Sequence, residues 1–377
     1  MDTMLKSLFK ACKVGDNNTV THILNANKYY VNRTIDEYNY EEDIDYRSPA
    51  ICTACKYGHL NIVKNLLQNG AFINAEDYNN IPKVYRLPLV EASENGHFEI
   101  VKYLIKCGAN PNGYIRTSSL FYACEHGYLD IVKYLIQNGA DVYFSGCAEE
   151  VLPIEVACLN RHSEVVKYLQ PLCTRIEPTR LLFLACGTGD VESVKYLTKN
   201  GANINHCNIH DDIWVPNPTT PLIKACACGY LEIVKYLIDS GVDVNYINQT
   251  YDPHDIKKFA DSYKDSWQNA TALIAACYNG ELDVVIYLIE KGANINYIYK
   301  RNFDCIDITP LMAASMSNNL DIVKYLISKK ANIDYHNYDC DSAYMIAYRE
   351  GYWSIVDYFE AIGYKEYYEC RSKYKRE

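Results

Sequence analysis

An internal repeat constrains the fold of this chain more than any other feature. A phrase close to Leu-x-Ile-Val-Lys-Tyr-Leu-Ile returns at 60–67, 98–105, 129–136, 231–238, 282–289 and 320–327, with weaker copies at 163–170, 191–198 and 353–360. In the copy at 129–136, Leu129, Val132, Leu135 and Ile136 fall on one side of a helix. The phrase therefore predicts a series of short amphipathic helices.

A hydroxyl residue followed by proline precedes several of these helices. Thr220-Pro221 and Thr309-Pro310 carry this signal. The hydroxyl caps the first free amide of a helix, and proline at the first helical position gives up no hydrogen bond. We place Pro49, Pro88 and Pro153 in the same column. Each signal predicts a first helix ahead of the repeated phrase.

A turn residue, usually glycine, separates the two helices of each unit. It recurs at Gly15, Gly58, Gly96, Gly127, Gly189, Gly229, Gly280 and Gly351, and Arg161 and Asn318 take its place in two further units. Phrases such as Gly-Ala-Asn-Ile-Asn at 292–296 follow the second helix and predict a left-handed glycine and the arm of a β-hairpin. Each unit is thus predicted to be a helix, a turn, a helix and a hairpin.

These elements in this order resemble the ankyrin repeat, whose period is about 33 residues. The resemblance implies an all-α-dominated repeat solenoid, elongated and curved, with β-hairpin fingers. Ten repeats are expected at about 3–33, 46–75, 84–113, 115–144, 148–176, 177–207, 217–247, 268–298, 306–336 and 338–364, followed by a short tail at 365–377. The repeat wording and the many Tyr, Asn and Ile residues also resemble the ankyrin-repeat proteins of giant DNA viruses of amoebae.

The repeats are expected to form one array over 1–364. A lone repeat loses on the order of 50 kcal/mol of conformational entropy, which its own small core cannot offset. Only 28 residues separate Arg161 from Gly189, and Pro171 interrupts a second helix. This irregularity predicts a bend or weak joint around 170–180. Longer separations between other successive turn residues place extra residues in loops at 33–47, 206–218 and 246–269.

One departure from the ankyrin pattern concerns the histidine that usually follows Thr-Pro-Leu. Ile223 and Met312 stand at that position. The resemblance then implies that the hydrogen bonds made by this histidine between repeats are missing, and that stacking depends more on apolar contact.

Composition excludes several classes of function. The net charge is −10 and no basic run is present, so we expect no nucleic-acid partner. No stretch reaches 18 consecutive apolar residues, so no membrane partner is expected. The N-terminus lacks the apolar region of a signal peptide. We expect an intracellular protein, cytoplasmic or nuclear, and in the host cell if it is viral.

Cysteine and tyrosine each recur at one position of the repeat. The cysteine column is Cys12, Cys55, Cys124, Cys158, Cys186, Cys226 and Cys277. Recurrence at one helical position favours small buried packing residues over thiol chemistry. The tyrosine column is Tyr103, Tyr134, Tyr168, Tyr196, Tyr236, Tyr287, Tyr325 and Tyr358. It predicts a structural ladder along the second helices, with the lysines before it in solvent.

Motifs for catalysis are missing from the sequence. It contains no P-loop, no His-Glu-x-x-His and no Gly-x-Ser-x-Gly, so we expect neither an enzyme nor a cofactor. His206, Cys207 and His210 form one ligand-like cluster. A polar loop is the favoured interpretation, and a metal site is the alternative.

Candidate binding residues are the two that precede each turn residue, because in ankyrin repeats this position faces the concave groove. They vary from repeat to repeat: Lys56, Tyr57, Glu94, Asn95, Glu125, His126, Tyr278, Asn279, Met316 and Arg349. Trp267, in the loop 246–269, is a further candidate because this aromatic loop presents an edge to a partner or docks back on the array.

The sequence therefore favours a monomeric, non-catalytic scaffold or adaptor that binds another protein. One alternative is a substrate adaptor of a ubiquitin ligase, since the array resembles poxviral ankyrin proteins that often end in an F-box-like domain. Residues 365–377 are too few for such a domain. The other alternative is a metal-binding protein that uses His206, Cys207 and His210.

Overall fold

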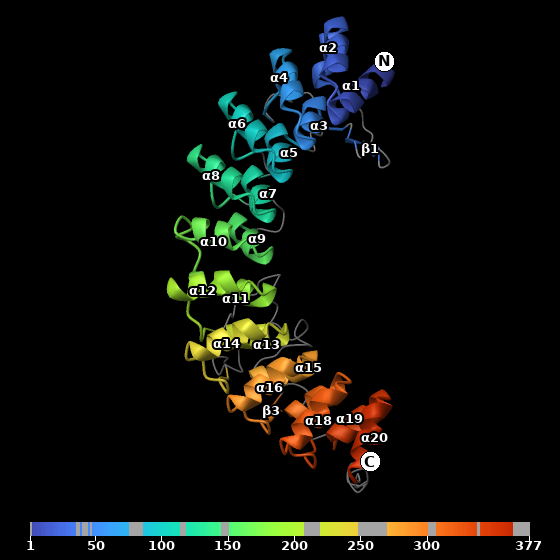
Figure 1. Ribbon diagram of the computed structural model, residues 1–377, viewed down its shortest axis with the longest axis vertical. Helices are drawn as coiled ribbons and strands as arrows, with labels where there is room; N and C mark the ends of the chain where they lie inside the picture. The colour runs from blue at the N-terminus through green and yellow to red at the C-terminus, as the bar shows by residue number, and fades with distance from the viewer. Residues whose placement is uncertain are drawn as a thin grey trace, which may run out of the picture. The chain divides into compact units, whose positions relative to one another are not determined.

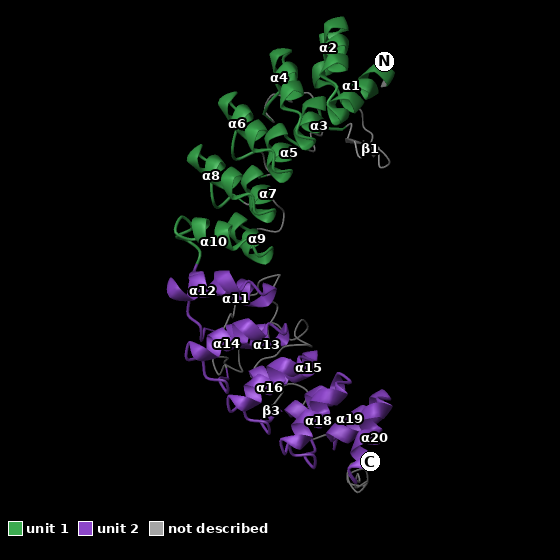
Figure 2. Ribbon diagram, viewed as in Figure 1, with its two compact units in different colours: residues 1–176 green, residues 177–377 purple. Residues whose placement is uncertain are grey.

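The computed structural model describes residues 2–34, 38–39, 44–45, 47–74, 86–113, 118–144, 151–206, 219–247, 270–300, 307–337 and 340–364. Its helices come in pairs that stack into two compact units, residues 1–176 and 177–377 (Figures 1 and 2). The predicted all-α repeat fold is confirmed. The boundary between the units falls in the segment 170–180, where helix α10 ends at Leu169, two residues before Pro171.

The described residues of unit 1 form five helix pairs. They are α1 (Asp2–Val14) with α2 (Asn17–Ala26), α3 (Ala50–Lys56) with α4 (Leu60–Gln68), α5 (Pro88–Glu94) with α6 (Phe98–Lys106), α7 (Ser119–Glu125) with α8 (Leu129–Gln137), and α9 (Pro153–Leu159) with α10 (Ser163–Leu169). A 3-10 helix, η1 (Lys28–Asn32), follows α2. The first helices α1, α3, α5, α7 and α9 pack in sequence, and the second helices do the same beside them (Figure 1).

Unit 2 repeats this arrangement. Its pairs are α11 (Pro178–Thr188) with α12 (Val191–Lys199), α13 (Pro221–Ala227) with α14 (Leu231–Asp239), α15 (Ala272–Asn279) with α16 (Leu282–Glu290), α17 (Pro310–Met316) with α18 (Leu320–Ser328), and α19 (Ala343–Glu350) with α20 (Trp353–Ala361). Each expected repeat thus contains one helix pair.

Strand pairing is limited in the described ranges to two short hairpins. β1 (Tyr38–Asn39) pairs antiparallel with β2 (Ile44–Asp45), with Tyr38 opposite Asp45. β3 (Tyr299–Lys300) pairs with β4 (Asp307–Ile308), with Tyr299 opposite Ile308. Across the described parts of the chain, no helix is long and apolar enough to cross a membrane.

The turns between paired helices adopt the left-handed backbone that the glycine column predicts. Gly58 has φ of 80°, and Arg161 and Asn318 have φ of 63° and 57°. This conformation costs a residue other than glycine about 1–2 kcal/mol. The packing around these two turns must offset that cost.

Burial on the second helices corrects the predicted apolar stripe. In α8 the buried side chains are Ile131, Val132 and Leu135, whereas Leu129 and Ile136 are only half-buried. The same Ile-Val-x-x-Leu triplet is buried in α4, α6, α14 and α18. The stripe moves because α8 packs against α6 and α10 as well as against its own first helix, α7.

The cysteine column is buried at all seven positions, as predicted. Ser93 and Ser315 occupy the same place in two other repeats and are fully buried. Neither hydroxyl has a hydrogen-bond partner among the described residues. This position therefore requires a small side chain, and it accepts a serine hydroxyl even though that hydroxyl makes no hydrogen bond to the described residues.

Histidines do form hydrogen bonds between repeats, but from a position other than the one after Thr-Pro-Leu. His59 Nε2 lies 2.8 Å from the carbonyl oxygen of Lys13, His97 Nε2 lies 2.9 Å from that of Lys56, and His162 Nε2 lies 2.8 Å from that of Glu125. These histidines stand one residue after the turn rather than after Thr-Pro-Leu. Each ring covers the turn glycine of the preceding repeat.

Asparagines form a second set of links where the second helices end. Asn74 donates to the carbonyl of Gly108 at 2.9 Å and accepts from the amide of Asn110 at 2.8 Å. In unit 2, Asn245 makes the same pair of bonds with Gly292 and Asn294, at 3.0 and 2.7 Å. Each asparagine therefore fixes the end of the next repeat through two bonds.

Four tyrosines of the predicted column contact lysines of the preceding repeat. Lys64 Nζ lies 5.5 Å from the ring centre of Tyr103, and Lys133 Nζ lies 5.5 Å from that of Tyr168. Lys235 with Tyr287 and Lys324 with Tyr358 repeat this contact in unit 2. Each pair joins neighbouring repeats through a cation–π contact, so these lysines are more than a solvated surface.

Candidate functional site

The candidate groove residues lie at the ends of the first helices, where the next repeat holds their backbone. The carbonyl of Lys56 is bound by His97, and that of Glu125 is bound by His162. In unit 2, Asn319 donates at 3.2 Å to the carbonyl of Cys277, one residue before Tyr278. The backbone at these positions is therefore fixed, while the side chains differ from one repeat to the next.

Four of the candidates line one pocket in unit 1. The pocket lies between the repeats of α3 and α5 and has a volume of about 230 Å³. Its walls are Arg47, Ser48, Cys52, Thr53, Lys56, Tyr57, Arg86, Glu91, Glu94 and Asn95. The structure therefore brings together Lys56, Tyr57, Glu94 and Asn95.

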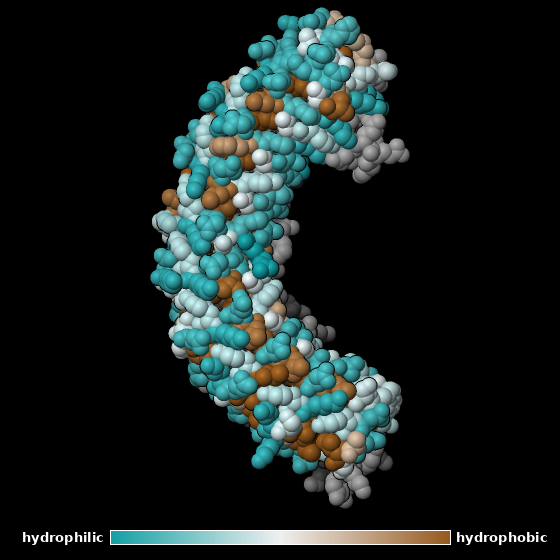
Figure 3. Space-filling model, viewed as in Figure 1, coloured by the Kyte–Doolittle hydropathy of each residue, from teal (hydrophilic) through white to brown (hydrophobic). Residues whose placement is uncertain are grey.

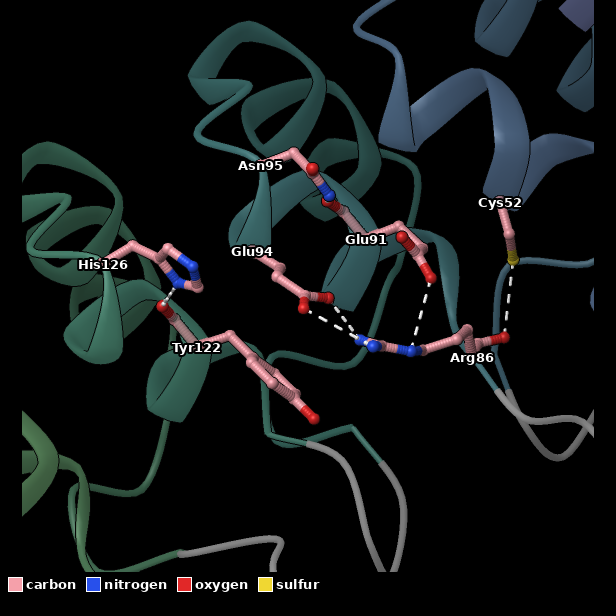
Figure 4. A network of polar contacts seen from close by, with 7 residues as sticks. All are labelled: Cys52, Arg86, Glu91, Glu94, Asn95, Tyr122 and His126. Atoms are coloured by element: carbon pink, nitrogen blue, oxygen red, sulfur yellow. Dashed lines mark hydrogen bonds and ion pairs between the residues drawn. The ribbon is translucent and has the colours of Figure 1, made fainter. Parts of the chain in front are cut away.

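Arg86 organises one wall of the pocket (Figure 4). Its guanidinium makes an ion pair with Glu94 through Nη1, and its Nη2 donates to Glu94 Oε1 at 3.4 Å. Its Nε lies 3.6 Å from Glu91 Oε1, and the group lies 5.3 Å from the ring centre of Tyr122 on α7. The carbonyl of Arg86 accepts a hydrogen bond from Cys52 Sγ at 3.4 Å. Arg86 thus links three successive repeats.

The charges around Arg86 shift its pKa upward. Burial is the largest single influence and lowers the pKa, but Glu91, Glu94 and Tyr122 together outweigh it. The guanidinium therefore stays charged, and both carboxylates have a cation beside them.

Ser48 forms part of the opposite wall because of a register difference at the start of α3. Pro88, Pro153, Pro221 and Pro310 stand eight residues before their turn residue, but Pro49 stands nine before Gly58. The alignment of Pro49 with the other prolines is therefore wrong by one residue. Pro49 itself is the N-cap of α3, and no side chain caps that helix. Ser48 is 2% exposed, and its hydroxyl has no hydrogen-bond partner among the described residues.

Tyr57 lines the pocket and has two lysines near its ring. Lys13 Nζ and Lys56 Nζ lie 5.3 and 5.5 Å from the centre of its ring. Lys13 holds the same place in the first repeat that Lys56 holds in the second. The two cations and the ring form a basic aromatic cluster at this end of unit 1.

The remaining unit 1 candidates lie one repeat further along. Glu125 ends α7, and His126 is its C-cap. His126 Nδ1 lies 3.0 Å from the carbonyl oxygen of Tyr122, and its ring stacks on that of Tyr128 at 5.8 Å.

The unit 2 candidates are spread over three repeats. Tyr278 is 40% exposed near the end of α15, and Asn279 donates to the carbonyl of Ala275 at 2.9 Å. Met316 ends α17 and is half-buried. Arg349, on α19, donates to Asp341 Oδ2 at 2.7 Å.

Two other hypotheses fall largely outside the described residues. Trp267, Cys207 and His210 lie there, as do most of the loops 33–47 and 246–269. His206 is described and exposed. In the part of the chain that the structure describes, no three His, Cys, Asp or Glu side chains come together as a metal site would require.

Sequence reasoning missed Arg47, Ser48, Arg86 and Glu91. A numerical signal was available, because position 86 precedes Glu94 by eight residues, as Asp341 precedes Arg349, and both pairs have opposite charges. Complementary charges at a recurring separation across a helix indicate an ion pair.

Paired antiparallel helices, left-handed turns and repeat-to-repeat asparagine links define a tandem helical repeat protein of the ankyrin type. Family comparison agrees: the model described as ankyrin repeats in three copies matches residues 8–115, 79–146, 115–180, 154–248, 181–299 and 295–363. The chain belongs to the ankyrin repeat family. Comparison with curated proteins found no match.

Proposed function

We propose that the chain is a non-catalytic scaffold or adaptor that binds a protein partner through the groove residues of its first helices. Ankyrin repeats are in general protein-interaction modules, and this chain belongs to that family. The observation that carries the proposal is the contrast at the groove positions. The carbonyls of Lys56 and Glu125 are held by the following repeat, while the side chains at the groove positions vary and four of them line a pocket.

The surface gives a second reason to favour a polar, side-chain-specific contact. In the view of Figure 3, hydrophobic residues on each unit lie in small separate patches among hydrophilic ones. Such patches do not by themselves form a broad apolar interface. A partner would then be chosen by charges and aromatic rings at the groove positions.

We also propose that the protein acts inside a cell as a monomer. Seven cysteines used as buried packing residues suit a reducing compartment. The repeat wording and composition further suggest a giant-virus origin, in which case the partner is a host protein.

Affinity purification of tagged protein from its natural cells, read out by mass spectrometry, tests the function. The groove variant carries Lys56→Glu, Tyr57→Ala, Glu125→Lys, Tyr278→Ala and Arg349→Glu. A matched control changes exposed residues outside the groove positions: Lys106→Glu, Leu172→Ala, Lys199→Glu, Glu232→Lys and Ile362→Ala. Both variants change net charge equally, and thermal unfolding checks that both fold.

Loss of a partner with the groove variant alone supports the proposal. A partner retained by the groove variant would move the contact to the loops 33–47 or 246–269. A ubiquitin-ligase subunit among the captured proteins would identify a substrate adaptor. Capture of no specific partner would overturn the proposed function.

A further inference from the structure

A third position of the first helices lies on the same face as the two groove positions. It stands five residues before the turn residue, and therefore three and four residues before the groove pair, which places all three on one side of a helix. In unit 1, Glu91 and Tyr122 occupy it in the third and fourth repeats. Both contact the Arg86 guanidinium. Side chains at this position therefore meet charged groups on the groove face.

Lys224 occupies this position in the seventh repeat. It lies on α13, which packs against α11 and α15 in unit 2 (Figure 1), and it is half-buried. Its side chain extends onto α11 at Gly187, a groove position of the sixth repeat. A Cβ atom on Gly187 would lie 2.7 Å from Lys224 Cε, 3.5 Å from Cγ and 3.7 Å from Cδ. Because glycine has no side chain, the methylenes of Lys224 have room to lie against α11.

The Lys224 ammonium has neither an ion pair nor a hydrogen bond within the part of the chain that the structure describes. Glu281, which reaches this repeat from the following one, lies over the turn at Gly229. Lys224 extends the other way, toward the preceding repeat. A half-buried cation has lost part of its hydration, and a counter-ion compensates for that loss. The described residues supply no such counter-ion to Lys224.

The equivalent positions around Lys224 are neutral. In the sixth to ninth repeats, the residues five, two and one before each turn residue carry no other charge. Three of them in the same and the adjoining repeats are small: Gly187, Ala227 and Ala275. Lys224 is therefore an isolated cation on the groove face of unit 2, in a chain with a net charge of −10.

We propose that Lys224 binds an acidic side chain of the protein partner, whose carboxylate accepts hydrogen bonds from the ammonium on the groove face of α13. This inference rests on the proposed protein-binding function and names the chemistry of one contact within it. The charge of Lys224 selects a carboxylate, and hydrogen bonds between two charged groups are the stronger kind. The small residues Gly187, Ala227 and Ala275 let the backbone of the partner approach.

Fluorescence anisotropy with two labelled peptides tests the inference on the full-length protein. One peptide has twelve residues of alternating Glu and Ser, and the other has Gln in place of every Glu. At low ionic strength we expect saturable binding of the Glu peptide and about fivefold weaker binding of the Gln peptide, a difference of about 1 kcal/mol. Physiological salt should weaken binding of the Glu peptide.

Variants at Lys224 and at a matched control position locate the contact. Lys224→Gln should weaken binding of the Glu peptide about fivefold without lowering the melting temperature, because no ion pair within the described residues is lost. Lys199→Gln removes the same charge from an exposed position at the end of α12 and should leave binding unchanged. Lys224→Glu should abolish binding of the Glu peptide. It should also bind a peptide with Lys in place of Glu more tightly than the wild-type protein does.

Gly187→Ala separates binding from stability. Gly187 lies within α11, where alanine is a better helix former, so the melting temperature should not fall. The added methyl group would meet Lys224 Cε at 2.7 Å, so the lysine side chain must move. Binding of the Glu peptide should then weaken at least twofold. A general loss of stability would not produce weaker binding together with an unchanged or higher melting temperature.

Equal binding of the Glu and Gln peptides, or equal effects of Lys224→Gln and Lys199→Gln, would overturn the inference. A lower melting temperature for Lys224→Gln together with no binding of the Glu peptide would also overturn it, because an acidic residue of the chain itself would then pair with Lys224. In affinity purification from natural cells, partners that the groove variant loses and Lys224→Gln retains would overturn the inference and leave the proposed function standing. Capture of no partner would overturn the function itself.

Discussion

The two units build the same repeat with different polar contacts. In unit 1 histidines cover three turn glycines and bind carbonyls of the preceding repeat, as His97 does with Gly58 and Lys56. In unit 2 the covering residues are Tyr230, Glu281 and Asn319.

The side-chain capping of the first helices also differs between the units, and here unit 2 has more polar contacts. Hydroxyls cap four of the five first helices of unit 2, through Thr220, Thr271, Thr309 and Ser342. In unit 1 no side chain caps α3 or α5. The described links by histidine thus lie in unit 1, whereas the threonine caps lie in unit 2, and one fold accommodates both solutions.

The largest expected effect concerns the buried cysteine thiols, which the two units share. Burial raises the pKa of Cys12, Cys55 and Cys124 in unit 1 and of Cys186, Cys226 and Cys277 in unit 2. Above about pH 8.5 the unfolded chain loses thiol protons that the folded chain keeps, so stability falls as pH rises, by about 1.4 kcal/mol per thiol and pH unit.

Urea unfolding at pH 7.5, 8.5, 9.5 and 10.5 measures this decline. Cys226→Ala should make the slope of unfolding free energy against pH shallower by one proton. An unchanged slope in this variant would contradict the assignment to buried thiols.

A methyl group at Gly58 probes the histidine contacts of unit 1. Gly58→Ala should destabilise by about 3 kcal/mol, because it combines a left-handed backbone with a Cβ that would lie 2.7 Å from His97 Cε1. Gly70→Ala, at a φ of 88° with open space around it, should cost about 1 kcal/mol. Thermal unfolding of both variants gives the comparison, and equal losses would mean that the ring moves aside freely.

Removal of the covering side chain compares the two units directly. His97→Ala leaves the Lys56 carbonyl without its 2.9 Å bond and should cost about 2 kcal/mol. Asn319→Ala removes a longer bond of 3.2 Å in unit 2 and should cost about 1 kcal/mol. Urea midpoints for the two variants measure the difference, and a larger loss for Asn319→Ala would reverse the comparison.

The smallest expected effect concerns helix starts. Thr309→Ala should destabilise by about 1 kcal/mol, since Thr309 Oγ1 accepts from the Met312 amide at 3.2 Å. Ser48→Ala should cost no more than about 0.5 kcal/mol, because its hydroxyl caps nothing. Differential scanning calorimetry resolves both, and a clear loss with Ser48→Ala would show that its hydroxyl does stabilise the fold.

Periodicity was enough to predict the helix pairs, the left-handed turns and the buried cysteines. Each is a property that every repeat must share, so ten copies of one pattern specify it. The histidine links do not follow from the ankyrin pattern, which places the linking histidine after Thr-Pro-Leu, whereas His59, His97 and His162 follow the turn.

The pocket could not be predicted in the same way. It depends on a single extra residue between Pro49 and Gly58, and the sequence does not say whether the helix start or the turn absorbs that residue. In the structure the turn at Gly58 keeps its usual position and α3 starts at Ala50, so the extra residue lies at the helix start. Ser48 then lines the pocket.

The carbonyl links have a consequence for anyone who recombines these repeats. Lys56 belongs to the second repeat by sequence, but the residue that fixes its backbone, His97, belongs to the third. A cassette cut at the repeat boundary would therefore carry Lys56 without the histidine that fixes its backbone. Under the proposed function, the smallest unit of unit 1 that could be transferred with its groove residues intact is one repeat together with the histidine that follows the next turn.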